Sequence, residues 1–118
     1  MKLECIHQVA VVREPGVLIE DGRSALDLLA AVRYETGCSA MILPREALCG
    51  DFFRLPTGLA GEILQKFVNY GMALAVVGDF SAFTSKNLRD FFYESNRGKT
   101  VCFLPTEAEA LERLGAER

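Results

Sequence analysis

Hydrophobic positions along the chain follow two different periods, and each period predicts a kind of element. Short runs in which every residue is apolar are typical of strands that are buried on both faces of a sheet. Longer stretches with an apolar residue at every third or fourth position are typical of helices with one buried face. Four such runs and the β-rich stretch HQVAVV predict five strands, at residues 7–12, 17–19, 40–43, 74–77 and 101–104.

The helical period predicts four helices between and after these strands. Their expected limits are Asp21 to Gly37, Gly58 to Tyr70, Thr84 or Ser85 to residues 96–98, and Thr106 to at least Leu114. Aspartate, serine and threonine favour helix starts because a side-chain oxygen accepts a free backbone N–H, and glycine favours helix ends. Thr106 and Glu109 have the spacing of a capping box.

Turn residues then set the order of the elements. Pro15-Gly16 predicts a hairpin turn between the first two strands. Beyond it strands and helices alternate, which is typical of parallel strands joined by right-handed crossovers. The order β-β-α-β-α-β-α-β-α predicts one α/β domain over residues 1–118, with a mostly parallel mixed sheet. Residues 45–56 predict only one or two helical turns.

Charge and length narrow the classes of partner. The chain has 118 residues, a quarter of them charged, and a net charge of −3. The arginines are scattered and form no basic run, so we expect no nucleic-acid partner. No apolar run approaches the roughly 20 residues that span a membrane, and the N-terminal residues, with Glu4 and His7 among them, do not predict a signal peptide. We therefore expect a cytoplasmic protein that does not bind membranes and that can form a homo-oligomer.

The four cysteines, Cys5, Cys38, Cys49 and Cys102, have no C-x-x-C spacing, and His7 is the single histidine. This arrangement predicts no metal site and no cofactor, and free thiols that pack in the core.

The stretch LPTGLAGEIL, residues 55–64, is the strongest candidate for a functional site. A helix begins there with small residues, so its unpaired N–H groups and the positive end of its dipole are accessible. Two adjacent phenylalanines precede it, and the alternatives are that one of them is exposed at an interface or that both lie in the core. The predicted partner-binding surface combines this tip, the polar face of the helix and the preceding segment: Thr57, Gly58, Glu62, Gln65, Lys66, Asn69, Asp51, Phe52 and Phe53. The alternative is that Thr57 only caps the helix and that Gly58 and Gly61 pack closely against residues 45–55.

Two other kinds of site stay open. The loop after the fourth strand, from Gly78 to Lys86, carries residues that suit a small molecule or an anion: Asp79, Ser81, Thr84, Ser85 and Lys86. An acidic cluster of Glu46, Asp51 and Glu62, or His7, predicts a small enzyme instead. The chain has no Gly-x-Ser-x-Gly elbow and no phosphate-binding glycine motif, so no catalytic residue is assigned and an enzyme is the less favoured class.

Two stretches resemble the STAS domains of bacterial anti-sigma-factor antagonists: PTGLAGEILQKFVNYGMALAVVG (56–78) and FLPTEAEALERL (103–114). The resemblance implies a STAS-like fold, a protein partner, and phosphorylation at the residue that matches Thr57. The sequence departs from STAS domains where Pro56 replaces their usual acidic residue and Thr57-Gly58 replaces Ser-Gly.

A longer resemblance is to bacterial proteins of the family called domain of unknown function 4180. It is carried by SALDLLA (24–30), DFFRLPTGLAGEILQKFVNYGMALAVVGDFS (51–81) and TSKNLRDFFYE (84–94). That family implies no particular activity. Together these observations predict a non-enzymatic, STAS-like regulatory module that docks a protein around Thr57.

Overall fold

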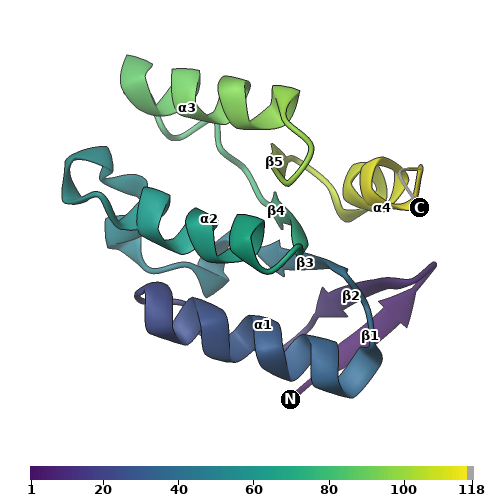
Figure 1. The fold of residues 1–118 in the computed structure, drawn as a ribbon. Coiled ribbons are helices and arrows are strands. Elements are labelled where there is room, and N and C mark those ends of the chain that lie inside the picture. The colour runs from purple at the N-terminus through teal and green to yellow at the C-terminus, as the bar shows by residue number, and fades with distance from the viewer. Residues whose placement is uncertain (117–118) are drawn as a thin grey trace.

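One five-stranded sheet, in the order β1-β2-β3-β4-β5, organises the chain (Figure 1). The computed structural model describes residues 1–116. Four strands run parallel and β1 pairs antiparallel with β2. The strands are β1 (Leu3–Ile6), β2 (Val9–Val12), β3 (Ala40–Pro44), β4 (Ala73–Val77) and β5 (Val101–Leu104). The predicted α/β class and mostly parallel mixed sheet are therefore confirmed.

The hairpin lies one turn earlier than predicted. β1 and β2 are joined by His7 and Gln8, whose φ angles are +50° and +66°. Two consecutive residues with positive φ make the kind of tight turn whose twist matches that of the flanking strands. Pro15-Gly16 instead begins the connection to the first helix, and residues 17–19 form no strand beyond an isolated bridge from Ile19 to Leu48.

The four predicted helices are present, and the ends of α1 and the start of α3 follow the expected capping chemistry. They are α1 (Gly22–Thr36), α2 (Leu59–Asn69), α3 (Lys86–Arg97) and α4 (Glu107–Ala116). The Asp21 carboxylate accepts the N–H of Ser24 at 2.8 Å, and Gly37 ends α1 with φ +71°. Ser85, rather than Thr84, caps α3.

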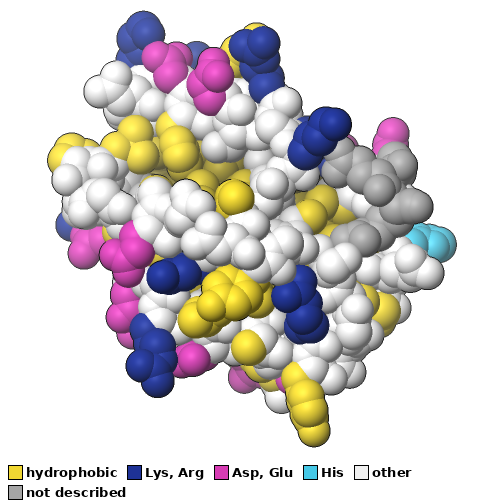
Figure 2. Space-filling view, viewed as in Figure 1, with side chains coloured by type: hydrophobic (Ala, Val, Ile, Leu, Met, Phe, Trp, Pro, Cys, Tyr) yellow, Lys and Arg dark blue, Asp and Glu magenta, His cyan; other side chains and the backbone are white. Residues whose placement is uncertain are grey.

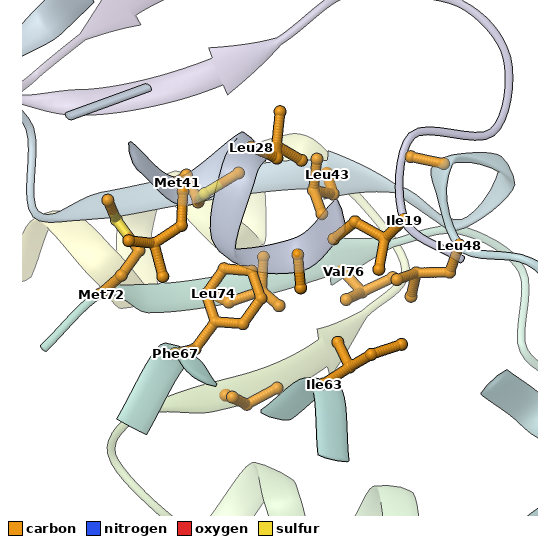
Figure 3. Packing of buried hydrophobic residues seen from close by; sticks show 14 of the residues in the cluster. Ile19, Leu28, Met41, Leu43, Leu48, Ile63, Phe67, Met72, Leu74 and Val76 are labelled. Carbon is orange, nitrogen blue, oxygen red and sulfur yellow. The ribbon is translucent and has the colours of Figure 1, made fainter. Parts of the chain in front are cut away.

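Helices cover the two faces of the sheet unequally, three on one face and one on the other. The face that packs against α1, α2 and α3 carries Ala10, Val12, Met41, Leu43, Leu74, Val76, Val101 and Phe103. Alternate residues point to the other face, where Ala110 and Leu114 of α4 cover Val9, Val11, Ala40, Ile42, Ala75 and Cys102. Figure 3 shows Ile63 and Phe67 of α2 facing the strands of the larger cluster. Because both faces are buried, the central strands contain only apolar residues.

Residues 45–57 connect β3 to α2 through three short 3₁₀ turns: η1 (Arg45–Ala47), η2 (Gly50–Phe53) and η3 (Leu55–Thr57). These turns bring the chain from the end of β3 to the start of α2 and place residues 53–57 beside α3. Among the described residues, no helix is both long enough and apolar enough to cross a bilayer.

Candidate functional site

The start of α2 is built from Thr57 and Gly58. Gly58 occupies the N-cap position, with φ +76°, so Thr57 lies one residue before the position that the capping alternative gave it. The Thr57 hydroxyl still accepts the N–H of Leu59 at 3.2 Å. Its own proton is directed at the backbone oxygens of Arg54, at 2.8 Å, or Asp51, at 3.1 Å. Thr57 therefore ties the helix start to the preceding turns.

The backbone at this tip is bare. A Cβ added to Gly58 or Gly61 would meet no heavy atom within 4 Å. The alternative that these glycines allow close packing against residues 45–55 is therefore wrong. Gly58 is explained by its positive φ, which residues with a Cβ rarely adopt. Gly61 has open space above it.

Beside this tip lies an open groove of about 740 Å³, which we call the Thr57 groove. One wall comes from residues 53–57, at the end of η2 and in η3, and the other comes from the N-cap and first turn of α3. The lining residues are Phe53, Arg54, Leu55, Pro56, Thr57, Ser85, Asn87 and Leu88. Figure 2 shows hydrophobic side chains gathered in the hollow between α3 and α2. Two segments that the sequence treated as separate candidates, around Thr57 and around Ser85, thus meet at one groove.

Phe53, which lines the groove, belongs to a cluster of packed phenylalanine rings. Phe53 is partly buried and stacks on Phe83, with ring centroids 4.8 Å apart. Phe52 is fully buried and packs edge-on against Phe53 and Phe91. Of the two alternatives, an exposed phenylalanine is therefore wrong. The 3₁₀ turn of η2 directs Phe52 into the core, and Phe80, Phe83 and Phe92 pack against Phe53.

The polar face of α2 is divided between two environments. The Glu62 carboxylate accepts the N–H of Gly22, at 2.8 Å, and so caps the start of α1 from a neighbouring helix. Lys66 lies beside it, over the same glycine. Gln65 and Asn69 are exposed and bond each other at 2.8 Å. Glu62 therefore has a structural partner and is a poor test of docking.

The acidic residues expected to form an enzyme site do not converge. Asp51 pairs with Arg54 at 2.9 Å, while Glu62 turns to α1. His7 is exposed in the β1–β2 turn. Within residues 1–116, no group of three His, Cys, Asp or Glu side chains is arranged to hold a metal ion.

The second predicted set, Asp79 to Lys86, is spread over different places. The Asp79 carboxylate accepts both the backbone N–H and the hydroxyl of Ser81, at 2.9 and 2.6 Å. These bonds, with a smaller contribution from Arg45, lower the pKa of Asp79. Asp79 and Ser81 line a separate hollow of about 340 Å³ beside Phe80, Asn96 and Phe103. Lys86 pairs with Asp90 at 2.8 Å.

Arg45 also belongs to this region, although the sequence did not predict it as a site residue. Its guanidinium donates to the backbone oxygen of Asp79 and lies over the Phe83 ring, 5.3 Å from the centroid. Its side chain also crosses Gly78, where an added Cβ would lie 2.8 Å from the Arg45 Cβ. The signal in the sequence is a glycine at the end of a strand, which often marks a close approach.

Comparisons with known proteins leave the activity open and settle the family. No curated protein matched the chain. A crystal structure of a Thermotoga maritima protein, proposed to be an anti-sigma factor antagonist, is similar in fold with 14% sequence identity and a TM-score of 0.47. The similarity covers 94% of this chain and 91% of that one. Residues 6–114 match the family described as "Domain of unknown function (DUF4180)". The chain therefore belongs to the DUF4180 family.

Proposed function

We propose that this chain is a STAS-like regulatory module that binds another protein at the Thr57 groove, and that phosphorylation of Thr57 prevents this binding. The observation that supports the proposal most is the position of Thr57 itself. It is an exposed hydroxyl residue on the wall of an open groove, next to a bare helix tip.

The lining of the groove suits a protein partner. Phe53, Leu55, Pro56 and Leu88 supply apolar surface, and Thr57, Ser85 and Asn87 supply hydrogen-bonding groups at the edges. Protein interfaces commonly combine an apolar centre with a polar rim. The expected partner presents an apolar side chain to the groove and hydrogen-bonding groups beside it.

A phosphate on Thr57 would change this surface without requiring the fold to change. It would add a charge of about −2 next to apolar side chains. A partner that covers these side chains would have to remove water from the phosphate as well, which costs binding free energy. The start of α2 tolerates the charge, because its free N–H groups and dipole favour anions. The modification would also replace the hydroxyl proton that now bonds Arg54 or Asp51.

The test is capture of partners from lysate of the source organism by the wild type and by matched variants, read by mass spectrometry. Thr57→Asp and Asn87→Arg change opposite walls of the groove. Tyr34→Asp adds the same charge as Thr57→Asp at a side chain on α1 that is 91% exposed, and it is the control. We expect one partner to be captured by the wild type and by Tyr34→Asp and lost with both groove variants. A partner retained by both groove variants would contradict the proposal.

Binding of a small molecule at Gly78–Lys86 remains the alternative function. The hollow beside Asp79 has a carboxylate on its wall, and Lys86 is engaged by Asp90. Both features favour a neutral or cationic ligand over an anion. A rise in melting temperature with such a ligand, lost in Ser81→Ala, would support this alternative.

A further inference from the structure

Two of the cysteines lie in contact although 33 positions separate them. The Sγ atoms of Cys5 and Cys38 are 3.3 Å apart, and one thiol donates a hydrogen bond to the other. Cys5 is in the edge strand β1, and Cys38 follows Gly37, where α1 ends. Figure 1 shows the end of α1 beside β1.

The contact follows from the register of the hairpin. Cys5 pairs with Ala10, whose side chain belongs to the cluster under α1. Side chains alternate along a strand, and directly paired residues point to the same face. Cys5 therefore points to the face that α1 covers, toward the residue that follows this helix. Cys38 belongs to the same cluster and is only 6% exposed.

We propose that Cys5 and Cys38 form a reversible redox site, which closes to a disulfide when the protein meets an oxidised low-molecular-weight disulfide such as oxidised glutathione. Closing the pair shortens the distance between the sulfurs from 3.3 Å to about 2.05 Å. This approach of little more than 1 Å lies within the reach of side-chain rotation.

The unequal exposure of the two thiols sets the order of the steps. Cys5 is exposed, and its hydrogen bond with Cys38 raises the pKa of its thiol, so the thiolate is the minor form. This thiolate, once its proton has passed to solvent, attacks one sulfur of oxidised glutathione. A Cys5–glutathione bond forms, the glutathione disulfide bond breaks, and one glutathione thiolate leaves and is protonated. The Cys38 thiolate then attacks the Cys5 sulfur and expels the second glutathione. Two protein thiols and one glutathione disulfide thus give one protein disulfide and two glutathione thiols.

The chain is well suited to a direct test, because trypsin places each cysteine on its own peptide. Cys5 falls on residues 3–13, Cys38 on 34–45, Cys49 on 46–54 and Cys102 on 100–113. The full-length reduced protein is incubated with oxidised glutathione, remaining thiols are blocked, and the unreduced digest is analysed by mass spectrometry. We expect one linked product, 3–13 joined to 34–45, and an intact mass lower by two hydrogens. Dithiothreitol should restore the starting mass.

Three variants make the order of the steps visible. Cys38→Ser should stop at a stable glutathione adduct on Cys5, because no second thiol is in reach. Cys5→Ser should give neither the linked peptide nor an adduct on the buried Cys38. Cys49→Ser, which removes a partly buried cysteine elsewhere, should form the linked peptide as the wild type does. Wild-type protein that keeps the glutathione adduct on Cys5, or that links other pairs, would overturn the proposal.

A second measurement checks that the disulfide fits the folded protein. A bond that closes a loop of this length restricts the unfolded chain, so the thermal midpoint of the oxidised wild type should rise by roughly 10 °C. Cys5→Ser should show no rise under the same treatment. An unchanged or lower midpoint in linked wild-type protein would show that the bond distorts the fold and would overturn the site as proposed. The test does not depend on any partner of the Thr57 groove.

Discussion

The side-chain amide of Asn96 forms hydrogen bonds with both the backbone N–H and the backbone carbonyl of Phe103. Its Oδ1 accepts the N–H of Phe103 at 2.6 Å, and its Nδ2 donates to the carbonyl oxygen at 3.1 Å. Asn96 belongs to α3, and Phe103 lies in β5, the strand at one edge of the sheet. A free edge offers a template for pairing with another chain. Asn96 thus covers part of this edge with a side chain, and Arg113 fixes the backbone of Asn96 in turn.

We expect Asn96→Ala to lower the free energy of unfolding by about 2 kcal/mol, because it leaves two partly buried backbone groups without a protein partner. Urea unfolding gives the value. Arg97→Ala, at the next position, removes an exposed residue that pairs with Glu94 at 3.9 Å and lies over the Tyr93 ring, 5.8 Å from its centroid. It should change the free energy by at most about 1 kcal/mol. Equal midpoints for Asn96→Ala and the wild type would show that water replaces the amide without loss.

The bond from Glu62 to Gly22 predicts coupling between α2 and α1. Glu62→Ala should cost about 1 kcal/mol, because it removes an anion from the start of α1. Gly22→Ala should disrupt the same bond, since its Cβ would lie 2.6 Å from the Glu62 carboxylate oxygen. Because both single variants lose the same bond, the double variant should lose less free energy of unfolding than the sum of the two single losses. Additive losses in a urea-unfolding cycle would rule out this link.

Two glycines predict opposite responses to the same substitution. Gly78→Ala should destabilise the protein by about 1–3 kcal/mol, because the new Cβ would lie 2.8 Å from the Arg45 Cβ, which cannot rotate away. Gly61→Ala should stabilise it by about 0.5–1 kcal/mol, since this helical position has open space and alanine favours helix. Thermal unfolding of both variants beside the wild type tests the pair, and a shift in the same direction would contradict it.

The Asp79–Ser81 turn predicts a specific dependence on pH. The pKa of Asp79 is lowered mainly by its bonds from Ser81, so the folded state favours the charged carboxylate. This contribution to stability is complete above the ordinary pKa of aspartate, about 4, and is lost as pH falls through the lowered value. In Ser81→Ala the pKa of Asp79 should rise toward its ordinary value. Carbon-13 NMR titration of the Asp79 carboxyl measures both, and identical curves would exclude Ser81 as the cause.

The sequence predicted the elements where a local signal was sufficient. Asp21 and Gly37 mark the two ends of α1, and the wholly apolar runs after residues 39 and 73 mark buried parallel strands. The hairpin was misplaced because Pro15-Gly16 is a stronger turn signal than His7-Gln8 when each is read alone. Pairing of β1 with β2 selects the weaker turn, since it seats Leu3 opposite Val12 and extends the sheet by one strand.

The candidate site also combines features that the sequence predicts with features that only the packing of elements decides. The sequence identified Thr57 and Ser85 from the chemistry of helix starts, which is a property of neighbouring residues. It could not place them in one groove, because that depends on how η3 and α3 pack over the sheet. It also could not show that the exposed Glu62 accepts the N–H of Gly22, or that Phe52 is buried, because both depend on how α1 packs against α2 and how η2 turns.

By itself, the sequence determined the order of helices and strands after the first hairpin, the ends of the helices, and membership of the chain in an α/β class, because hydrophobic period and capping act over a few residues. Only the tertiary structure decided that Arg45 crosses Gly78, that Asn96 closes the edge at Phe103, and that Cys5 meets Cys38. Each of these contacts joins residues on different elements. Their positions are fixed by sheet register and helix packing, which no local pattern encodes.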